Sequence, residues 1–156
     1  NVVDLLVLLA VIAVAAGVGY KLFAPQIAEA AAKQVDMTMI VRVRGATPFL
    51  VAEVERNSQV GKQIVSGNSY TSAVITDMQI EPYDQQVTTA DGRIVTARDP
   101  DKRDLVFTIE TTVPEGTASP SIGTQEVRAG RTFIVKTNDF ETTGNIDSVD
   151  IAASAE

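Results

Sequence analysis

Three aspartates lie close together in the sequence, and carboxylate side chains such as theirs are the ligands that hard metal ions prefer. Asp99, Asp101 and Asp104 belong to the stretch RDPDKRD, and Ca²⁺ prefers oxygen ligands of this kind. The stretch lacks the glycine and the terminal bidentate glutamate of an EF-hand loop, and its interleaved basic residues neutralise the acids. We therefore expect a solvated hairpin tip, with calcium binding as the weaker alternative, and we assign no metal or cofactor.

A second set of acids has the spacing of a general acid and a general base. Glu53 and Glu55 lie in FLVAEVE, a run that we interpret as a strand, in which alternate side chains share one face. General acid-base catalysis also needs a suitably placed partner and a cleft for the substrate. The chain has no histidine to serve as that partner, so we expect a structural role for both glutamates.

The composition excludes several classes of protein. The chain has no cysteine, histidine or tryptophan, which removes disulfides, Cys/His zinc sites and every catalytic triad that uses imidazole or thiolate. No Walker loop, GxGxxG, GxSxG or HExxH sequence occurs. Lys and Arg total 13 against 20 Asp and Glu, so we expect no nucleic-acid surface. We predict that the protein is not an enzyme, and we infer no small-molecule substrate.

The opening of the chain predicts a hydrophobic helix. Residues 5–20 carry no charge and lie between Asp4 and Lys21. As a helix they would cover about 24 Å, which approaches the ~30 Å of a bilayer core once flanking apolar residues are added. A core helix of a globular protein, the weaker alternative, would show a single apolar stripe instead. We predict a long helix over residues 1–35, kinked near Pro25.

The carboxylate of Asp4 would have to be neutralised in an apolar environment. If the mature chain begins at Asn1, the α-amino group lies within about one helical turn, and the two charges could pair between neighbouring subunits. Small residues on one face would let such helices approach closely. The residues that we assign to assembly are Asp4, Leu5, Leu6, Leu8, Leu9, Ile12, Ala13, Ala16, Gly17 and Pro25.

The sequence resembles two protein families, one through its opening residues and one through stretches along the whole chain. The stretch VVDLLVLLAVIAVAAG resembles the N-terminal segment of type IV pilins, in which an acidic residue neutralises the N-terminus of an adjacent subunit; Asp4 stands where that family has glutamate. NVVDLLV, GVGYKLF, VRVRGATPFLV, ADGRIVTARDPDKRDLVFTIE and RAGRTFIVKT…GNIDSV are similar to a bacterial family of single-pass, envelope-anchored proteins. The second resemblance implies an architecture and no chemistry.

From residue 36 onward the sequence predicts β structure. TMIVRVR places Met39, Val41 and Val43 on one face, and further short β-branched runs follow, separated by turn sequences such as ADGR and RAGR. QVGKQIV recurs as RAGRTFIV, which suggests a repeated hairpin module, and residues 113–126 read as a long exposed loop. The predicted fold class is α+β: a helical segment over 1–35 and an all-β domain, a small barrel or sandwich, over 36–156.

Two hypotheses for function remain at this point. In the first, the chain is a structural, pilin-like subunit of an extracellular filament at the cell surface, which passes through the membrane and then polymerises with itself through its N-terminal helices. In the second, it is a single-pass membrane-anchored envelope protein whose β domain, outside the membrane, binds or scaffolds a partner. A helix that is apolar on every side needs apolar neighbours in either setting.

Overall fold

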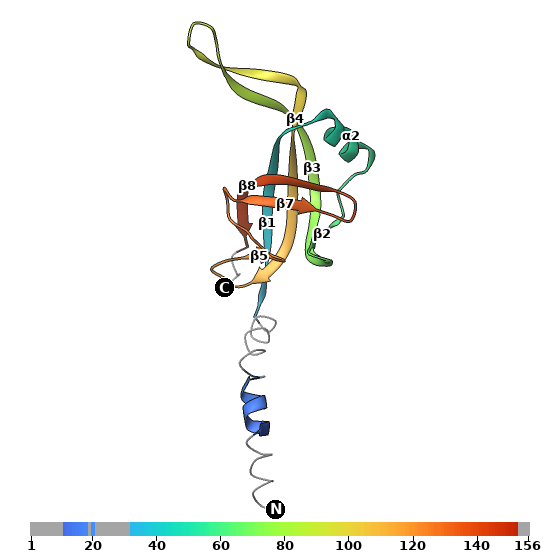
Figure 1. Ribbon diagram of the computed structural model, residues 1–156, viewed down its shortest axis with the longest axis vertical. Coiled ribbons are helices and arrows are strands. Elements are labelled where there is room, and N and C mark those ends of the chain that lie inside the picture. The colour runs from blue at the N-terminus through green and yellow to red at the C-terminus, as the bar shows by residue number, and fades with distance from the viewer. Residues whose placement is uncertain (1–10, 19, 21–31, 153–156) are drawn as a thin grey trace, which may run out of the picture. The chain divides into compact units, whose positions relative to one another are not determined.

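The chain divides into two compact units, Asn1–Gln34 and Val35–Glu156. The computed structural model describes residues 11–18, 20 and 32–152 (Figure 1). In the first unit, residues 11–18 and 20 are helical and exposed.

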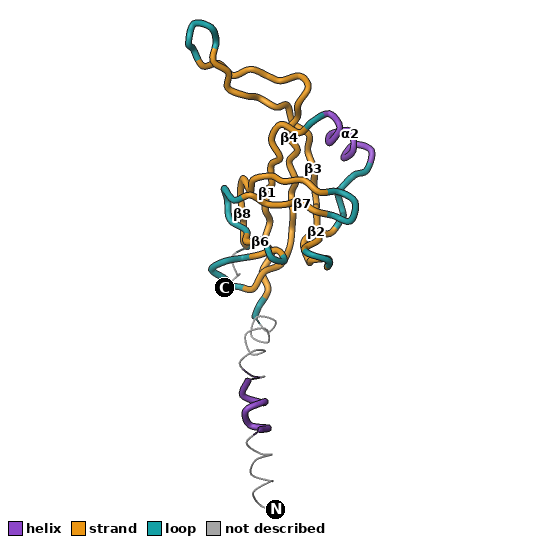
Figure 2. Tube along the Cα trace, in the orientation of Figure 1, coloured by secondary structure: helices purple, strands orange, loops and turns teal. Residues whose placement is uncertain are grey.

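The second unit is built around one six-stranded sheet that curls into a nearly closed barrel, together with α2 and the two-stranded sheet β5-β6 (Figures 1 and 2). The strand order is β2-β3-β4-β1-β8-β7, and the pairs β2–β3, β3–β4, β1–β8 and β7–β8 are antiparallel. The elements are β1 (Gln34–Ala46), α2 (Pro48–Arg56), β2 (Gln63–Ser66), β3 (Ser69–Thr88), β4 (Ile94–Pro114), β5 (Ser121–Ile122), β6 (Gln125–Glu126), β7 (Thr132–Lys136) and β8 (Glu141–Ile151).

The barrel interior is filled by side chains that alternate along the strands. In β1, Met39 and Val41 are fully buried, whereas Arg42, between Val41 and the buried Val43, reaches the outer face, which confirms the period-two pattern of TMIVRVR. The rings of Phe107 and Phe140 lie 6.1 Å apart between centroids, in a tilted arrangement that suits aromatic packing. The expected all-β domain is therefore present, and it is a barrel.

The α+β class is wrong, because the described chain is mostly strand. The described helical residues 11–18 include Gly17, which costs about 1 kcal/mol of helix propensity relative to alanine. Among the described residues, no helix combines the length and the apolar character that crossing a membrane requires. The predicted fold class with a long N-terminal helix is therefore corrected, and so is the description of the chain as transmembrane and pilin-like. The filament and the membrane anchor remain untested hypotheses for function.

The stretch FLVAEVE forms the helix α2 rather than the predicted strand. Pro48 occupies the first turn after Thr47, where its missing N–H costs no hydrogen bond and its fixed φ suits a helix. Leu50 and Val54 follow at helical spacing, and both contribute to the packed core. A short apolar run cannot be assigned to helix or strand by its periodicity alone, and the proline was the informative residue.

Two hairpins repeat the same geometry, as the recurrence of QVGKQIV and RAGRTFIV suggests. Gly61 has a φ of 86° and donates its N–H to the carbonyl of Ile75 at 2.7 Å. Gly130 has a φ of 85° and donates to the carbonyl of Ile146, also at 2.7 Å. Both glycines thus have a positive φ, which residues with a Cβ atom rarely adopt. The β2–β3 and β7–β8 hairpins occupy equivalent positions at opposite ends of the sheet.

The β5–β6 hairpin joins β2 to β7 at the seam of the barrel, by which we mean the gap between these two edge strands. The Gln125 side chain donates to the Ile134 carbonyl at 3.1 Å and accepts from the Ile134 N–H at 2.8 Å, so it makes the two bonds that a neighbouring strand would make. Ser66 Oγ accepts the Thr124 N–H at 3.1 Å. Residues 113–126 are therefore only partly an exposed loop, since Ile122 is buried.

Candidate binding surface

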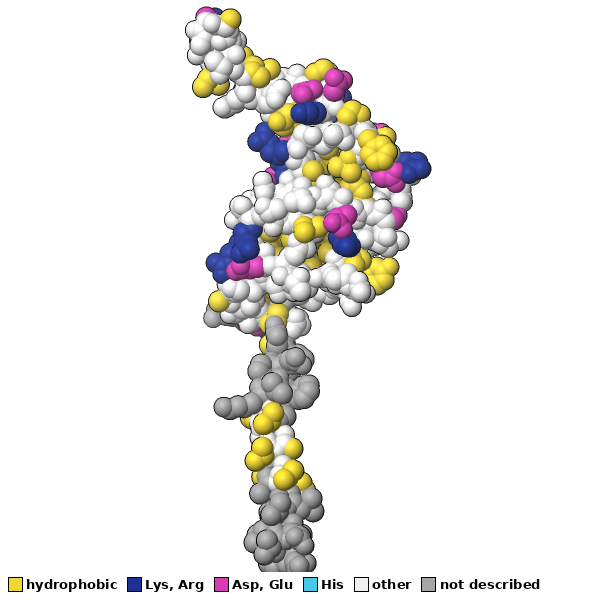
Figure 3. All heavy atoms as spheres, in the orientation of Figure 1, with side chains coloured by type: hydrophobic (Ala, Val, Ile, Leu, Met, Phe, Trp, Pro, Cys, Tyr) yellow, Lys and Arg dark blue, Asp and Glu magenta, His cyan; other side chains and the backbone are white. Residues whose placement is uncertain are grey.

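The β3–β4 hairpin continues beyond the barrel as a two-stranded ribbon, Tyr83–Asp99, which we call the arm (upper part of Figure 1). Its strands pair from Tyr83 with Asp99 to Thr88 with Ile94. At the tip, Thr89 N–H donates to the Arg93 carbonyl at 2.8 Å. In Figure 3 the arm stands clear of the barrel. A two-stranded ribbon is at best marginally stable alone, so its course depends on how its base is held.

A proline on each strand and a bulge produce the bend at the base of the arm. Pro82 pairs with Arg103, and the next pair is Tyr83 with Asp99, so Pro100–Lys102 have no partner across the ladder. The Arg103 guanidinium donates to the carbonyls of Pro100 and Lys102 at 2.9 and 2.8 Å. Because proline cannot donate to a ladder, pairing stops here and resumes in a new direction.

The Tyr83 ring fixes the base of the arm to the barrel. The Arg44 guanidinium carbon lies 5.6 Å and the Lys102 ammonium nitrogen 5.8 Å from the ring centroid, both within the range of a cation–π contact. Arg44 also donates to the Asp84 carbonyl at 3.1 Å. The base of the arm is therefore held by contacts to β1 as well as by its own ladder.

Both outer edges of the arm present backbone groups that lack a neighbouring strand. β1 lies beside β4 in the barrel but ends at Ala46, before the arm begins. Near this end of β1, the Gly45 N–H donates to the Asp104 carboxylate at 2.9 Å. β2 pairs with β3 no further along than Val74. Within the described residues, no strand is paired with the outer edge of either arm strand. The arm thus offers two unpaired edges to other molecules.

The hydrogen bond at the tip shows which backbone groups face outward. In antiparallel pairs, residues alternate between bonding across the ladder and pointing away from it. Because Thr89 bonds to Arg93 across the ladder, odd-numbered residues of the arm face inward. The outward-facing groups on β4 belong to Ile94, Thr96 and Arg98, and those on β3 belong to Asp84, Gln86 and Thr88.

The predicted calcium site does not come together. Asp99 accepts the Asp101 N–H at 3.0 Å within the bulge, whereas Asp104 lies inside β4, almost fully buried, beside Arg42 at 3.7 Å. Among the described residues, no group of acids is placed to hold a metal ion. RDPDKRD is also not a hairpin tip, because the chain turns at Asp91-Gly92, six residues before Arg98, and RDPDKRD lies within β4 at the base of the arm.

Arg42 lies at the centre of a row of charges across the outer face of the barrel. Its guanidinium contacts Glu81 at 2.6 Å and Asp147 at 2.7 Å. These bonds, to Glu81 first and then to Asp147, raise the pKa of Arg42 further above its usual value. The row therefore joins β3, β1 and β8 through one side chain and serves the fold.

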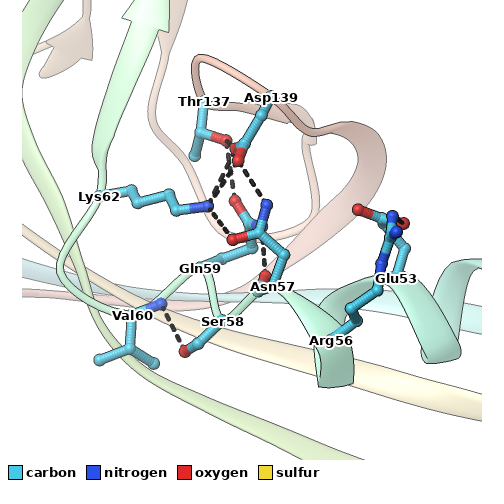
Figure 4. A network of polar contacts seen from close by, with 9 residues as sticks. All are labelled: Glu53, Arg56, Asn57, Ser58, Gln59, Val60, Lys62, Thr137 and Asp139. Carbon is cyan, nitrogen blue, oxygen red and sulfur yellow. Dashed lines mark hydrogen bonds and ion pairs between the residues drawn. The ribbon is translucent and has the colours of Figure 1, made fainter.

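Figure 4 shows a polar cluster at the seam that could be mistaken for a catalytic site. Lys62 donates to Asp139 at 2.8 Å and to Asn57 at 2.9 Å, and Asn57 donates to Asp139 at 2.5 Å. The bonds from Lys62, and then from Asn57, lower the pKa of Asp139 to about 2. The fully buried Gln59 accepts from the Thr137 hydroxyl at 2.8 Å. These groups bond to one another, so the cluster joins the start of β2 to the β7–β8 turn.

The remaining predicted residues do not meet at a site. Glu53 pairs with Arg56 one helical turn away, and Glu55, two residues on, lies well around the helix from Glu53. Ile12, Ala13, Ala16 and Gly17 lie in the exposed helix. The other assembly residues, Asp4, Leu5, Leu6, Leu8, Leu9 and Pro25, lie outside the described residues.

Sequence reasoning recognised the Asp91-Gly92 turn and missed the arm. The available signal was a proline on each side of that turn, Pro82 and Pro100, with the uncharged runs Gln85–Thr88 and Ile94–Ala97 between them. Central strands avoid proline, so these two prolines mark where the hairpin leaves the sheet.

The comparisons with known proteins give a family and no activity. The family model Domain of unknown function (DUF4330) matches residues 1–150. No curated protein and no solved structure matches the chain. The two resemblances drawn from the sequence, to pilins and to envelope-anchored proteins, receive no support from this match.

Proposed function

Given that the chain belongs to the family Domain of unknown function (DUF4330), we propose that it is a non-enzymatic binding protein whose arm docks by adding its strands to a strand of a protein partner. The observation that carries this proposal is the pair of unpaired edges on Tyr83–Asp99. Strand addition supplies affinity through backbone hydrogen bonds and specificity through alternate side chains.

The composition of the arm supports a docking role. Natural proteins protect exposed strand edges with charges, prolines or bulges along the strand. Here the prolines and the bulge lie only at the base, and the runs Gln85–Thr88 and Ile94–Ala97 carry no charge. Ile94 is 69% exposed. An edge whose central residues carry no charge, proline or bulge is suited to pairing with another strand.

The fixed base supports the same role. The contacts of Tyr83 with Arg44 and Lys102, and of Arg44 with the Asp84 carbonyl, hold the arm where it leaves the barrel. Holding a binding element in one orientation lowers the entropy that is lost when it binds. The proposal keeps the part of the second sequence-based hypothesis in which the β domain binds or scaffolds a partner.

Site-specific photo-crosslinking in the source cells tests this proposal. A photoreactive phenylalanine analogue replaces Ile94 on the arm or, as a matched control, Tyr70 on the barrel; the native side chains are 69% and 63% exposed. We expect discrete protein adducts from position 94 and at least several-fold fewer from position 70. Equal yields at the two positions, or no adduct at position 94, would overturn the proposal.

A further inference from the structure

We propose that the partner of the arm is a second copy of this chain, which pairs antiparallel with the outer edge of β4 about a two-fold axis at Thr96. The result is a four-stranded sheet made of two arms. This inference rests on the proposed function, because it names the occupant of the same edge. Two-fold pairing is the commonest symmetry of homo-oligomers, and a strand edge can always be complementary to its own copy.

The limits of the free edge determine the register. The edge begins at Arg93, after the Gly92 turn, and ends at Asp99, before Pro100. Its midpoint is Thr96, which has outward-facing backbone groups. Pairing Thr96 with its own copy therefore uses the whole edge and places Ile94 opposite Arg98 of the second copy, so that all the outward groups form hydrogen bonds.

The same register pairs opposite charges. Arg93 lies opposite Asp99 of the second copy, and by symmetry Asp99 lies opposite the second copy's Arg93. Cross-strand pairs of opposite charge stabilise a sheet, whereas like charges destabilise it. Asp99 is 21% and Arg93 80% exposed, so Arg93 has the freedom to leave its intrachain contact with Asp91 and reach across.

The neighbouring registers are less favourable. A shift by two residues in one direction brings Asp99 opposite Asp91 of the second copy, which places like charges together. A shift by two residues in the other direction places Ile94 opposite Pro100 of the second copy, which has no N–H to donate. Both shifts also lose the contact of Arg93 with Asp99, so the register centred on Thr96 is preferred.

The outer edge of β3 is the weaker candidate for the same pairing. One of its outward groups, the Asp84 carbonyl, already accepts a hydrogen bond from Arg44. Its midpoint is Gln86, and a two-fold pairing centred there sets Asp84 opposite Thr88 of the second copy and creates no ion pair. The β4 edge is fully available and charge-complementary, and it is therefore assigned.

Pairing at the β4 edge would also lengthen a row of apolar side chains on one face of the arm. Val87, Val95 and Ala97 share one face of the arm, because Val87 pairs with Val95 across the ladder and Ala97 follows on the same face. In the four-stranded sheet, Val95 would lie opposite Ala97 of the second copy. The contact is short and lies at the small end of specific interfaces, so we expect a concentration-dependent equilibrium between monomer and dimer.

Disulfide trapping tests the two-fold axis. The chain has no cysteine, and a hydrogen-bonded antiparallel pair has Cα atoms about 5.5 Å apart, within the range that a disulfide spans. Thr96→Cys in the 156-residue chain should therefore form a covalent dimer on mild oxidation. Gln86→Cys, on the residue that pairs with Thr96 within one arm, is the matched control and should remain monomeric. A monomeric Thr96→Cys protein, or a dimer through Gln86→Cys instead, would overturn the proposal.

A mixing experiment tests the register. In the Thr96→Cys background, Arg93→Asp and Asp99→Arg should each lower the rate of dimer formation about tenfold, because each creates two like-charge contacts. In a mixture of the two variants, the heterodimer has both charge pairs restored, one in the native sense and one reversed. Its formation should be about tenfold faster than dimer formation by either variant alone, and no acceleration on mixing would overturn the register.

Failure of this inference is distinguishable from failure of the proposed function. Adducts at position 94 that contain a different protein, together with a monomeric Thr96→Cys chain, would preserve the docking role and exclude the second copy. Absence of any adduct at position 94 would exclude both.

Discussion

Asp139 occupies the β7–β8 turn and bonds to two residues that precede β2, far away in the sequence. It accepts from Lys62 and from Asn57, which lie 77 and 82 positions away along the chain. Its carboxylate form is the one that these donors stabilise, and this is why the pKa of Asp139 falls to about 2. The ionisation of this residue is therefore coupled to the joining of the two edge strands.

We predict a pH dependence of stability that arises from Asp139. Its pKa is lower in the folded than in the unfolded chain, so its contribution is complete above about pH 4 and is lost as the pH falls towards 2. Asp139→Asn should have a lower melting temperature than the parent at pH 6, and the difference should shrink as the pH approaches 2. Asp150→Asn, on an exposed position of β8, is the control. Parallel melting curves for Asp139→Asn and the parent would contradict the prediction.

Single residues differ in how much of their role the sequence reveals. The inward residues of β1 were predicted, because alternation along a strand is a local property of the chain. The roles of Asp139 and Lys62 were not predicted, because their partners are distant in sequence and nothing near them distinguishes them from ordinary polar loop residues. Asp104 was considered as a metal ligand, whereas its burial beside Gly45 and Arg42 depends on β1 and β4 meeting.

At the scale of elements, the β5–β6 hairpin substitutes for a strand at the edge of β7. Its Gln125 side chain bonds to both the N–H and the carbonyl of Ile134. Gly123 in the same turn has a φ of 59°, and a Cβ atom there would lie 2.2 Å from the Ser66 side chain. The hairpin can approach β2 this closely only because glycine occupies that position.

We predict that Gln125→Ala will loosen β7. Each lost hydrogen bond is worth about 0.5–1.5 kcal/mol, so the Ile134 amide should exchange with deuterium about tenfold faster. Gln125→Glu keeps the acceptor for the Ile134 N–H and should have a smaller effect, whereas Gln86→Ala on the arm should have none. Unchanged exchange at Ile134 in the alanine variant would show that the seam is closed by other contacts.

The elements were predicted unevenly. The change to period two after residue 36 identified the β domain, and the recurrence around Gly61 and Gly130 identified the repeated hairpin. The stretch 48–56 was predicted to be a strand because it contains β-branched residues, although Pro48 is typical of the first turn of a helix. The arm was missed because two paired strands of about twenty residues each exceed the usual strand length, and the turn-like RDPDKRD suggested that β4 was interrupted.

At the scale of the whole molecule, the barrel and the arm are expected to be independent in stability. The buried core residues come from the barrel, its loops and α2, and none of them lies within Tyr83–Asp99. The contacts that hold the arm are exposed ion pairs and cation–π contacts at its base, which contribute little to folding. The sequence of the arm can therefore vary with little cost to the fold of the barrel.

We predict that removal of the arm leaves the barrel intact. Replacing Tyr83–Lys102 by Asn-Gly joins Pro82 and Arg103, which already pair, by a two-residue hairpin turn. No fully buried residue is lost with the arm, so the melting temperature should change by less than about 2 °C. Phe107→Ala, in the core, should lower stability by about 3–5 kcal/mol as a positive control. A large loss of stability in the shortened chain would show that the arm contributes to folding.

The barrel is a sheet whose two margins meet without a backbone ladder, and this has a mechanical consequence. The described contacts between β2 and β7 come from side chains and from the short hairpin that lies between them. A load that pulls the two margins apart would break these contacts one at a time, while the ladders between neighbouring strands stay whole. Opening the seam would expose to water the side chains that fill the barrel, so the barrel would close again when the tension is released.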